Sequence, residues 1–273
     1  MRPLIKGGLS ILFKLADLPY VPSPRVTACG TGFNKKEEYG ASHVISLGER
    51  RALKTIKEAR NDLVAHCRSH LIRSYPAGMR FTSSNYSPLP FWAAGVQLVA
   101  LNWQTYDLGT ELNAAFFQRN GRSGYVLKPE LLRMKRSEEK DKAALARVEK
   151  YILMIEILSA QQLPRPQGTS ESDSADAMKN LPMNPFIEIA VHTPTVSSGD
   201  VVKYTTPVVW GNGFNPVFEK SKYHIPFTVP PDMLDLAFLK LEVMVKLDGD
   251  EMSLGKYSVS LPVLMPGGSC FTY

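Results

Sequence analysis

Histidines are the side chains of this sequence best suited to acid–base or metal chemistry, and there are five of them. Only His66 and His70 lie close together, four residues apart, which would place both rings on one face of a helix. That spacing suits two metal ligands, but no glutamate lies between the two histidines and no third ligand is evident. We therefore predict that the pair lies on a solvated helix face.

The cysteines and the apolar runs bear on the setting of the protein. Cys29, Cys67 and Cys270 are too widely spaced for a disulfide framework, which favours a reducing, cytoplasmic environment. No apolar run approaches the roughly 18 residues that a membrane span needs. The N-terminus weakly imitates a signal peptide, but Lys14 and Asp17 interrupt its apolar run, so we do not expect secretion.

The net charge of +6 is unevenly distributed. Lysine and arginine outnumber aspartate and glutamate by 17 to 9 in residues 1–132 and by 7 to 4 in residues 133–150, whereas the acids lead by 13 to 8 in residues 151–273. A basic first half suits an anionic partner such as a phosphoinositide headgroup or a membrane surface. An ordinary solvated surface would explain the charge equally well, and we expect no nucleic-acid partner.

Residues 75–128 contain the densest set of turn and strand signals. A turn is predicted at Tyr75, where a proline follows directly and Gly78 comes three residues later. The apolar, partly β-branched residues 96–101 predict a buried strand, and the polar residues 102–105 follow at its carboxyl end.

A helix and a second strand are predicted after that point. Residues 107–118 have helical apolar spacing, and Asn120 and Gly121 predict a left-handed stop. Residues 124–128 predict another short strand. Strand, helix and strand, with polar residues at the strand ends, are typical of a parallel α/β barrel.

At these residues the sequence resembles the Y box of eukaryotic phosphoinositide-specific phospholipase C, which forms the second half of a split (β/α)8 barrel. Thr82 departs from the acid that is usual in the family, and Val96 from a common cysteine. Upstream, GFNKKEEY resembles the fungal branch. The matching motifs are, in order, YPAG, Arg80, SSNYSP, Trp92, Gln97, VALN, QT, NG and GYVLKP.

Residues 49–74 precede this region and have apolar side chains at intervals of three and four, so they predict a helix. Within it, Asn61 and Asp62 are suited to cap a second helix.

The resemblance implies a substrate-binding set of Ser46, Arg73 and Tyr75. Ser46 aligns with a serine that contacts an inositol phosphate, and its hydroxyl can donate one hydrogen bond. Arg73 aligns with a phosphate-binding arginine, whose planar fork suits a phosphate. Tyr75 aligns with the tyrosine that packs against the inositol ring. Without the resemblance, a helix-terminal arginine and a core tyrosine would be the simpler interpretations.

The resemblance also implies what this chain does not supply. Family enzymes use two histidines and a Ca²⁺ ion held by carboxylates, and all of these belong to the X half of the barrel. None of the five histidines here, among them His43, His192 and His224, lies in such a context. We therefore predict that the chain contains no catalytic residue and is inactive without an X half.

Residues 133–150 predict a charged linker with few apolar anchors and a domain boundary. From residue 151 the apolar period becomes two, which predicts an antiparallel β-sandwich. The motifs ILSAQQLPRP, NPFIEI, GNGFNPVFE and LGKYSVSLP resemble the C2 domain that follows the Y box in the same family. We expect the polar loop at residues 159–183 to be disordered or inserted, and the domain to lack its last strand.

This C2 sequence departs from calcium-binding relatives. Asn184 stands where an aspartate is expected, and Val245 and Leu247 fall near a later aspartate pair. The nearby acids, such as Asp248, fit a solvated turn better than a shifted site. We hypothesise that the C2 domain is calcium-independent.

Together these features predict a Y-box half-barrel (residues 1–132), a linker (133–150) and a C2 domain (151–273). The function that the resemblance implies is hydrolysis of phosphatidylinositol 4,5-bisphosphate to diacylglycerol and inositol 1,4,5-trisphosphate in intracellular signalling, at the inner membrane surface, with an X half or missing N-terminal domains as partners. The alternative is a non-catalytic fragment that binds lipid or protein.

Overall fold

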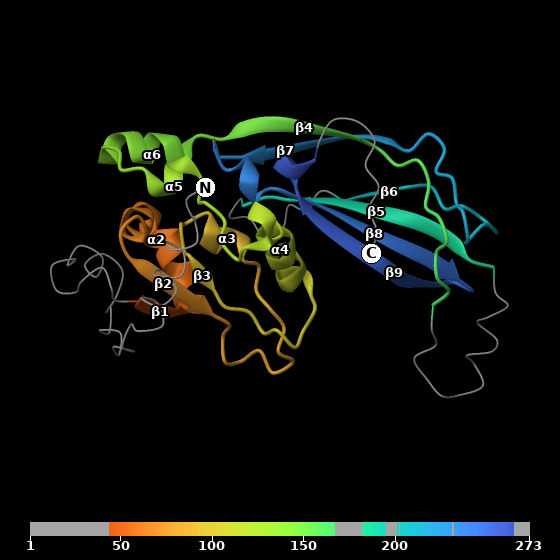
Figure 1. The fold of residues 1–273 in the computed structure, drawn as a ribbon, viewed down its shortest axis with the longest axis horizontal. Coiled ribbons are helices and arrows are strands. Elements are labelled where there is room, and N and C mark those ends of the chain that lie inside the picture. Colours follow the sequence, from red (N-terminus) through yellow and green to blue (C-terminus); the bar gives the residue numbers. More distant parts are fainter. Residues whose placement is uncertain (1–43, 167–181, 195–200, 202, 231, 265–273) are drawn as a thin grey trace, which may run out of the picture.

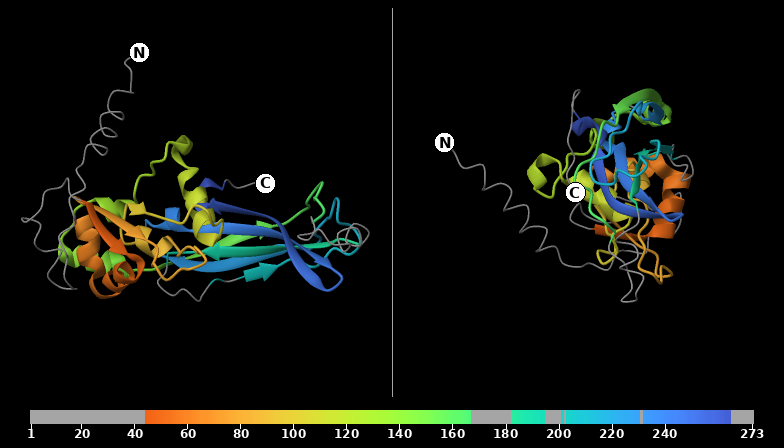
Figure 2. Two further views of the ribbon diagram at one scale, coloured as in Figure 1. Left: turned by 90° about the horizontal axis from the view of Figure 1, so that it is seen from below. Right: turned by 90° about the vertical axis from the view of Figure 1, so that its right-hand side faces the viewer.

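The computed structural model describes residues 44–166, 182–194, 201, 203–230 and 232–264. His43, GFNKKEEY, most of the polar loop and the carboxyl-terminal segment lie outside the described residues. Two parts lie end to end along the long axis (Figures 1 and 2): a half-barrel of residues 44–133 and a β-sandwich of residues 149–264. None of the described helices is long and apolar enough to cross a membrane.

The half-barrel is built on a three-stranded parallel sheet in the order β1 (Val44–Gly48), β2 (Leu71–Tyr75), β3 (Leu98–Val99). Side chains alternate across it: Ile45 and Ile72 are buried against helix α2 (Glu49–Cys67), whereas the opposite face is not covered by the described residues. Because β1 and β2 are parallel, α2 must carry the chain back between them.

Three sequence predictions change here. The predicted helix of residues 49–74 ends at Cys67, because Leu71–Tyr75 pairs with β1; apolar spacing alone did not reveal this partner. Within α2 the backbone breaks at Ala59, shortly before the predicted second cap. The predicted strand at 96–101 shrinks to β3.

Residues 124–128 were predicted to be a strand, and this prediction is wrong. A strand requires a hydrogen-bonded neighbour, and none of the described strands pairs with this segment. Instead Lys128 Nζ donates to the Cys67 carbonyl at 2.6 Å, which satisfies the carboxyl end of α2. Gln97 supports the same end, since its Nε2 donates to the Cys67 and His70 carbonyls and its Oε1 accepts from Ile72 N.

The helix predicted at 107–118 is confirmed as α4 (Leu108–Phe117). Asp107 caps it by accepting hydrogen bonds from the Gly109 and Thr110 amides. Asn120 and Gly121 adopt the predicted positive φ angles, 52° and 63°, in a 3₁₀ turn, η2 (Asn120–Arg122). A four-residue helix, α3 (Leu89–Trp92), precedes β3.

The charged segment after the half-barrel is helical and held in place. It follows α5 (Glu130–Arg133), the last helix of the half-barrel, and contains α6 (Glu138–Ala146). Arg68 donates to both Asp141 carboxylate oxygens, at 2.6 and 2.9 Å, and to the Leu131 carbonyl at 2.9 Å. Together with the buried Leu145, this pair anchors α6 to the half-barrel.

The predicted antiparallel β-sandwich is confirmed. Its antiparallel sheets are β4–β7 and β6–β5–β8–β9, which enclose an apolar core that includes Ile189, Ile225 and Leu239. The short 3₁₀ turns are η3 (Leu234–Leu236) and η4 (Leu261–Val263). The strands are β4 (Glu149–Glu156), β5 (Asn184–His192), β6 (Lys203–Thr205), β7 (Lys222–Val229), β8 (Phe238–Leu247) and β9 (Asp250–Ser260).

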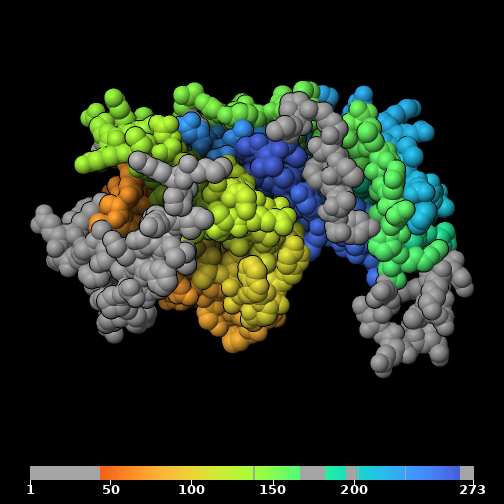
Figure 3. Space-filling model, viewed as in Figure 1, coloured from red at the N-terminus to blue at the C-terminus, as the bar shows by residue number. Residues whose placement is uncertain are grey.

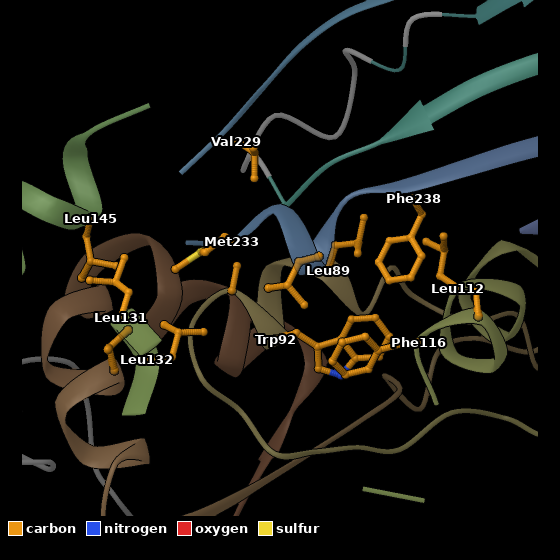
Figure 4. Close-up of a cluster of buried hydrophobic side chains, with 14 residues drawn as sticks. Leu89, Trp92, Leu112, Phe116, Leu131, Leu132, Leu145, Val229, Met233 and Phe238 are labelled. Carbon is orange, nitrogen blue, oxygen red and sulfur yellow. The ribbon is translucent and has the colours of Figure 1, made fainter. Parts of the chain in front are cut away.

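One apolar cluster joins the two parts (Figure 4). Trp92 of α3 stacks on Phe116 of α4 with ring centroids 4.5 Å apart, and Phe238 of β8 lies 6.3 Å from both rings. Met233 and Leu145 extend the cluster toward α6. The half-barrel and the β-sandwich therefore share buried surface and are not independent along this side.

Ion pairs border the cluster. Glu111 of α4 is buried and pairs with Lys256 of β9 at 2.5 Å and with Lys240 of β8 at 3.6 Å. Burial opposes the charge of Lys240, but its bonds to Glu242 and Glu111 outweigh burial and raise the pKa of its ammonium group. Arg119 and Asp235 form a further pair at 3.0 Å.

Replacing Glu111 by glutamine tests this junction. Glu111→Gln keeps the shape but leaves two half-buried lysines short of a counter-charge, so we expect a loss of about 1–3 kcal/mol in the free energy of unfolding, measured by urea denaturation. The control Glu156→Gln breaks an exposed pair with Lys222 and is expected to cost less than about 0.5 kcal/mol. Equal costs would show that the buried pair has no special role.

Candidate functional site

The three predicted binding residues lie side by side on the uncovered face of the parallel sheet. The register places Ser46 beside Arg73 and Gly48 beside Tyr75. Ser46 is half-buried, Arg73 is exposed, and Tyr75 is 40% exposed. Period-two alternation puts all three on the side opposite to the buried residues.

The arginine and the tyrosine interact with each other. Arg73 Cζ lies 5.4 Å from the centroid of the Tyr75 ring, a cation–π distance. A β-carbon at Gly48 would stand 3.5 Å from Cε2 and Cζ of this ring, an ordinary van der Waals distance, so the tyrosine ring lies against β1. Among the described residues no carboxylate pairs with Arg73. Its guanidinium group can therefore donate hydrogen bonds to a bound anion.

A buried ion pair fixes the turn that follows Tyr75. Arg80 donates to the Glu49 carboxylate through Nη2 at 2.6 Å and Nε at 2.7 Å, and the Ala77 amide donates to the same carboxylate at 3.1 Å. The hydrogen bonds from Arg80 hold the pKa of Glu49 below its usual range despite partial burial. This fork holds the YPAG turn at the carboxyl end of β2.

Asn85 ties together the loops beyond that turn. Its Oδ1 accepts from the Asn102 amide at 2.6 Å, and its Nδ2 lies 3.0–3.2 Å from acceptors on Asn102, Thr105, Asp107 and Thr110. The Asn85 amide also donates to Asp107 at 2.7 Å. Burial opposes ionisation of Asp107, but these donors outweigh burial and lower the pKa of its carboxyl group.

A buried tyrosine joins the sheet to the same loops. Tyr86 Oη lies 2.9 Å from Ser74 Oγ and donates to the Ala100 carbonyl at 3.0 Å. Burial raises the pKa of Tyr86 to about 12, so its hydroxyl stays protonated and serves as a structural link. The motif SSNYSP therefore acts through the backbone positions that it fixes.

Sequence reasoning missed the partners of this site. Glu49 was read only as the start of a helix, although it follows β1 directly and binds Arg80. Met79 and Phe81 in the adjacent turn are 63% and 88% exposed and went unnoticed. Two apolar side chains inside an otherwise polar turn were the available signal, and it is a weak one because single exposed apolar residues are common.

The prediction of a solvated histidine pair is wrong. His66 and His70 are 0% and 8% exposed, and their rings stack with centroids 4.7 Å apart. They fall at the end of α2 where α5 and α6 cover it, which the sequence could not reveal. In the β-sandwich, burial lowers the pKa of His192 to about 4. Among the described residues no three histidine, cysteine or acidic side chains gather as a metal site.

The C2 positions also lack a calcium donor set in the described residues. The Asn184 side chain donates to the Lys246 carbonyl at 3.2 Å and accepts from the Gly211 amide at 2.9 Å, so it links strand β8 to the loop that contains Gly211. Val245 and Leu247 are buried in the core. Asp248 lies in the exposed β8–β9 turn with a φ angle of 47°, as predicted for a solvated turn.

Comparison with known proteins agrees with this architecture. The family description of the phosphatidylinositol-specific phospholipase C Y domain matches residues 21–131, and that of the C2 domain matches residues 151–269. The chain therefore belongs to the phosphoinositide-specific phospholipase C family, of which it carries a Y domain followed by a C2 domain. The predicted fold class, a parallel half-barrel followed by an antiparallel C2 domain, is confirmed.

Curated relatives are considerably longer. The 1-phosphatidylinositol 4,5-bisphosphate phosphodiesterase 1 of Candida albicans is 34% identical over 231 residues, covering 76% of this chain and 20% of that protein. The human 1-phosphatidylinositol 4,5-bisphosphate phosphodiesterase delta-4 is 32% identical over 235 residues. The match covers 86% of this chain and 29% of that protein. This chain thus spans less than a third of the length of these relatives.

Solved structures give the same result. The crystal structure of L. pealei PLC21 is 26% identical, covers 98% of this chain and 34% of that chain, and has a TM-score of 0.67. The crystal structure of S. officinalis PLC21 is 28% identical and has a TM-score of 0.64. The match covers 86% of this chain and 28% of that chain.

The Asn85 network yields a direct test. Asn85→Ala leaves the Asn102 amide and several loop carbonyls without their partner, so we expect the protein to lose about 2–3 kcal/mol of stability. Amide hydrogen exchange should rise most in residues 83–86 and 102–107. As a control, Asn212→Ala removes only exposed side-chain bonds of the β-sandwich and should leave these loops unchanged. Uniform exchange across the chain would contradict a local role for Asn85.

Proposed function

We propose that this chain supplies the headgroup-binding part of a phospholipase C that hydrolyses phosphatidylinositol 4,5-bisphosphate to diacylglycerol and inositol 1,4,5-trisphosphate. The observation that supports this most is the pairing of Ser46 with Arg73 on the uncovered face, with the Tyr75 ring beside them. The names of the relatives point to the same substrate.

In this proposal each residue has a separate role. Arg73 binds a phosphate through two parallel N–H donors, and Ser46 donates one hydrogen bond to a phosphate oxygen. The Tyr75 ring packs against the inositol. The Glu49–Arg80 fork holds the backbone after Tyr75, so the ring needs little ordering when the headgroup binds. The chain's own residues thus bind and orient the substrate.

The remaining chemistry is assigned to an X half, encoded in the same protein or carried by a partner chain. That half would supply the two histidines and the carboxylates of the catalytic Ca²⁺, which assists the attack on the phosphorus. The described residues of this chain do not fit that ion. We propose that the chain alone does not turn over, because its sheet has two open edges and cannot enclose a substrate.

We further propose a peripheral position at the cytoplasmic membrane surface. The exposed Met79 and Phe81 lie in the turn directly after β2, next to the proposed headgroup site. Apolar side chains at this rim would enter the lipid surface while Arg73 reaches the headgroup. We also propose the domain boundaries predicted from the sequence: a Y-box half-barrel at residues 1–132, a linker at 133–150 and a C2 domain at 151–273.

The test pairs the full chain with an X-half polypeptide of a relative and measures release of inositol trisphosphate. We expect release, and Arg73→Gln should lower it about 10- to 100-fold, the loss expected for one charged phosphate contact. The matched control Arg51→Gln removes an exposed arginine of α2 and should have no effect. If no X half restores release while inositol trisphosphate still binds, the chain is the alternative, a non-catalytic binding fragment.

We also propose that the C2 domain is calcium-independent, because Asn184 is occupied in a structural link and Val245 and Leu247 face the core. Calorimetric titration of the full chain with Ca²⁺ should give no binding in the micromolar range. Micromolar binding that is lost in the variant Asp248→Asn/Asp250→Asn would mean that the acidic turn forms a calcium site and that the proposal is wrong.

A further inference from the structure

Helix α6 has two chemically different faces. Asp141 and Leu145 point inward, where Asp141 pairs with Arg68 and Leu145 joins the shared core. Lys140, Ala143 and Arg147 are exposed and recur at helical spacing on the outer face, whereas Ala144 is partly buried between this face and the core. Because the inner face is fixed by a buried ion pair and an apolar contact, the outer stripe is presented on a rigid element.

The outer stripe borders a shallow, open depression of about 530 Å³. Its lining consists of three cationic side chains and two alanines, Arg136, Lys140, Ala143, Ala144 and Arg147. None of the described side chains that line it is a carboxylate, so the lining itself carries net positive charge.

The cations of the depression are incompletely neutralised. Among the described residues Lys140 has no ion-pair partner. Arg136 pairs with Glu130 at 3.5 Å, and Arg147 pairs with Glu149 at 2.8 Å through one guanidinium nitrogen. A guanidinium has five donors, so each arginine retains donors for another acceptor.

The position of α6 separates this depression from the proposed headgroup site. Arg68 follows α2 and precedes β2, so its pair with Asp141 places α6 at the amino end of the strands. Tyr75 and Phe81 belong to the carboxyl end of the same sheet. Figures 1 and 3 show α6 at the edge of the molecule away from the loops that follow β2 and β3. A bilayer that meets the rim would therefore not reach this depression at the same time.

We propose that this stripe is a docking site for an acidic, extended peptide segment of a partner protein. An open depression leaves a small molecule largely in water, whereas a peptide gains contacts along its length. Lys140 and Arg147 are seven positions apart, which corresponds to about 10 Å along a helix. An extended peptide spans about 10 Å with about three residues. The two alanines let the peptide backbone approach between the cations.

The test measures binding of a fluorescein-labelled octapeptide of alternating glutamate and aspartate to the full chain by fluorescence anisotropy. The variant Arg136→Gln/Lys140→Gln/Arg147→Gln should weaken binding about tenfold or more, since three charged contacts are lost. The matched control Arg51→Gln/Lys54→Gln/Lys57→Gln removes the same charge from exposed positions of α2 and should change affinity less than about twofold.

Thermal melting by circular dichroism confirms that both variants are folded, as expected for exposed substitutions. Equal weakening by both triple variants would mean that net charge alone attracts the peptide and would overturn the proposal. It would also be overturned if inositol hexakisphosphate bound more tightly than the peptide and lost affinity in the α6 variant. The same holds if that variant lost binding to phosphatidylinositol 4,5-bisphosphate vesicles as strongly as Arg73→Gln does.

Discussion

A short parallel sheet needs cover on at least one face, and in this protein α2 covers one face of the sheet while the β-sandwich packs on α3 and α4. Trp92 and Phe116 of the half-barrel meet Phe238 of β8 in one apolar cluster, and Leu145 of α6 completes it. The half-barrel has a second core of its own under the parallel sheet, and the shared cluster buries further apolar surface of α3 and α4. The shared cluster therefore stabilises the half-barrel in addition to that core.

Rigidity at the uncovered face follows from that support. The sheet aligns Ser46, Arg73 and Tyr75, but the loops at its carboxyl end are ordered by polar contacts, the Glu49–Arg80 fork and the amide of Asn85. These contacts are partly buried, where charged hydrogen bonds are stronger than in water. A binding surface that is already ordered loses less conformational entropy when a ligand arrives.

The segment between the two matched domains, which contains α6, packs against the same shared cluster. Its charge and low apolar content predicted a linker with few anchors, yet Asp141 and Leu145 fix α6 to both neighbours. Two inward side chains suffice, because one forms a buried ion pair and the other enters the shared cluster. The remaining charges of α6 stay on the outside, where they create the basic depression.

The sequence by itself determined the family, the fold class, α4 with its left-handed stop, and the strands of the β-sandwich, because these depend on motifs and on local period. It did not determine that residues 71–75 form a strand, that 124–128 do not, or that His66 and His70 are buried. Those outcomes depend on partners distant in the chain. Tertiary structure alone decided which strands pair and which helix face is covered, and hydrogen bonding and burial across such distances leave no local pattern to read.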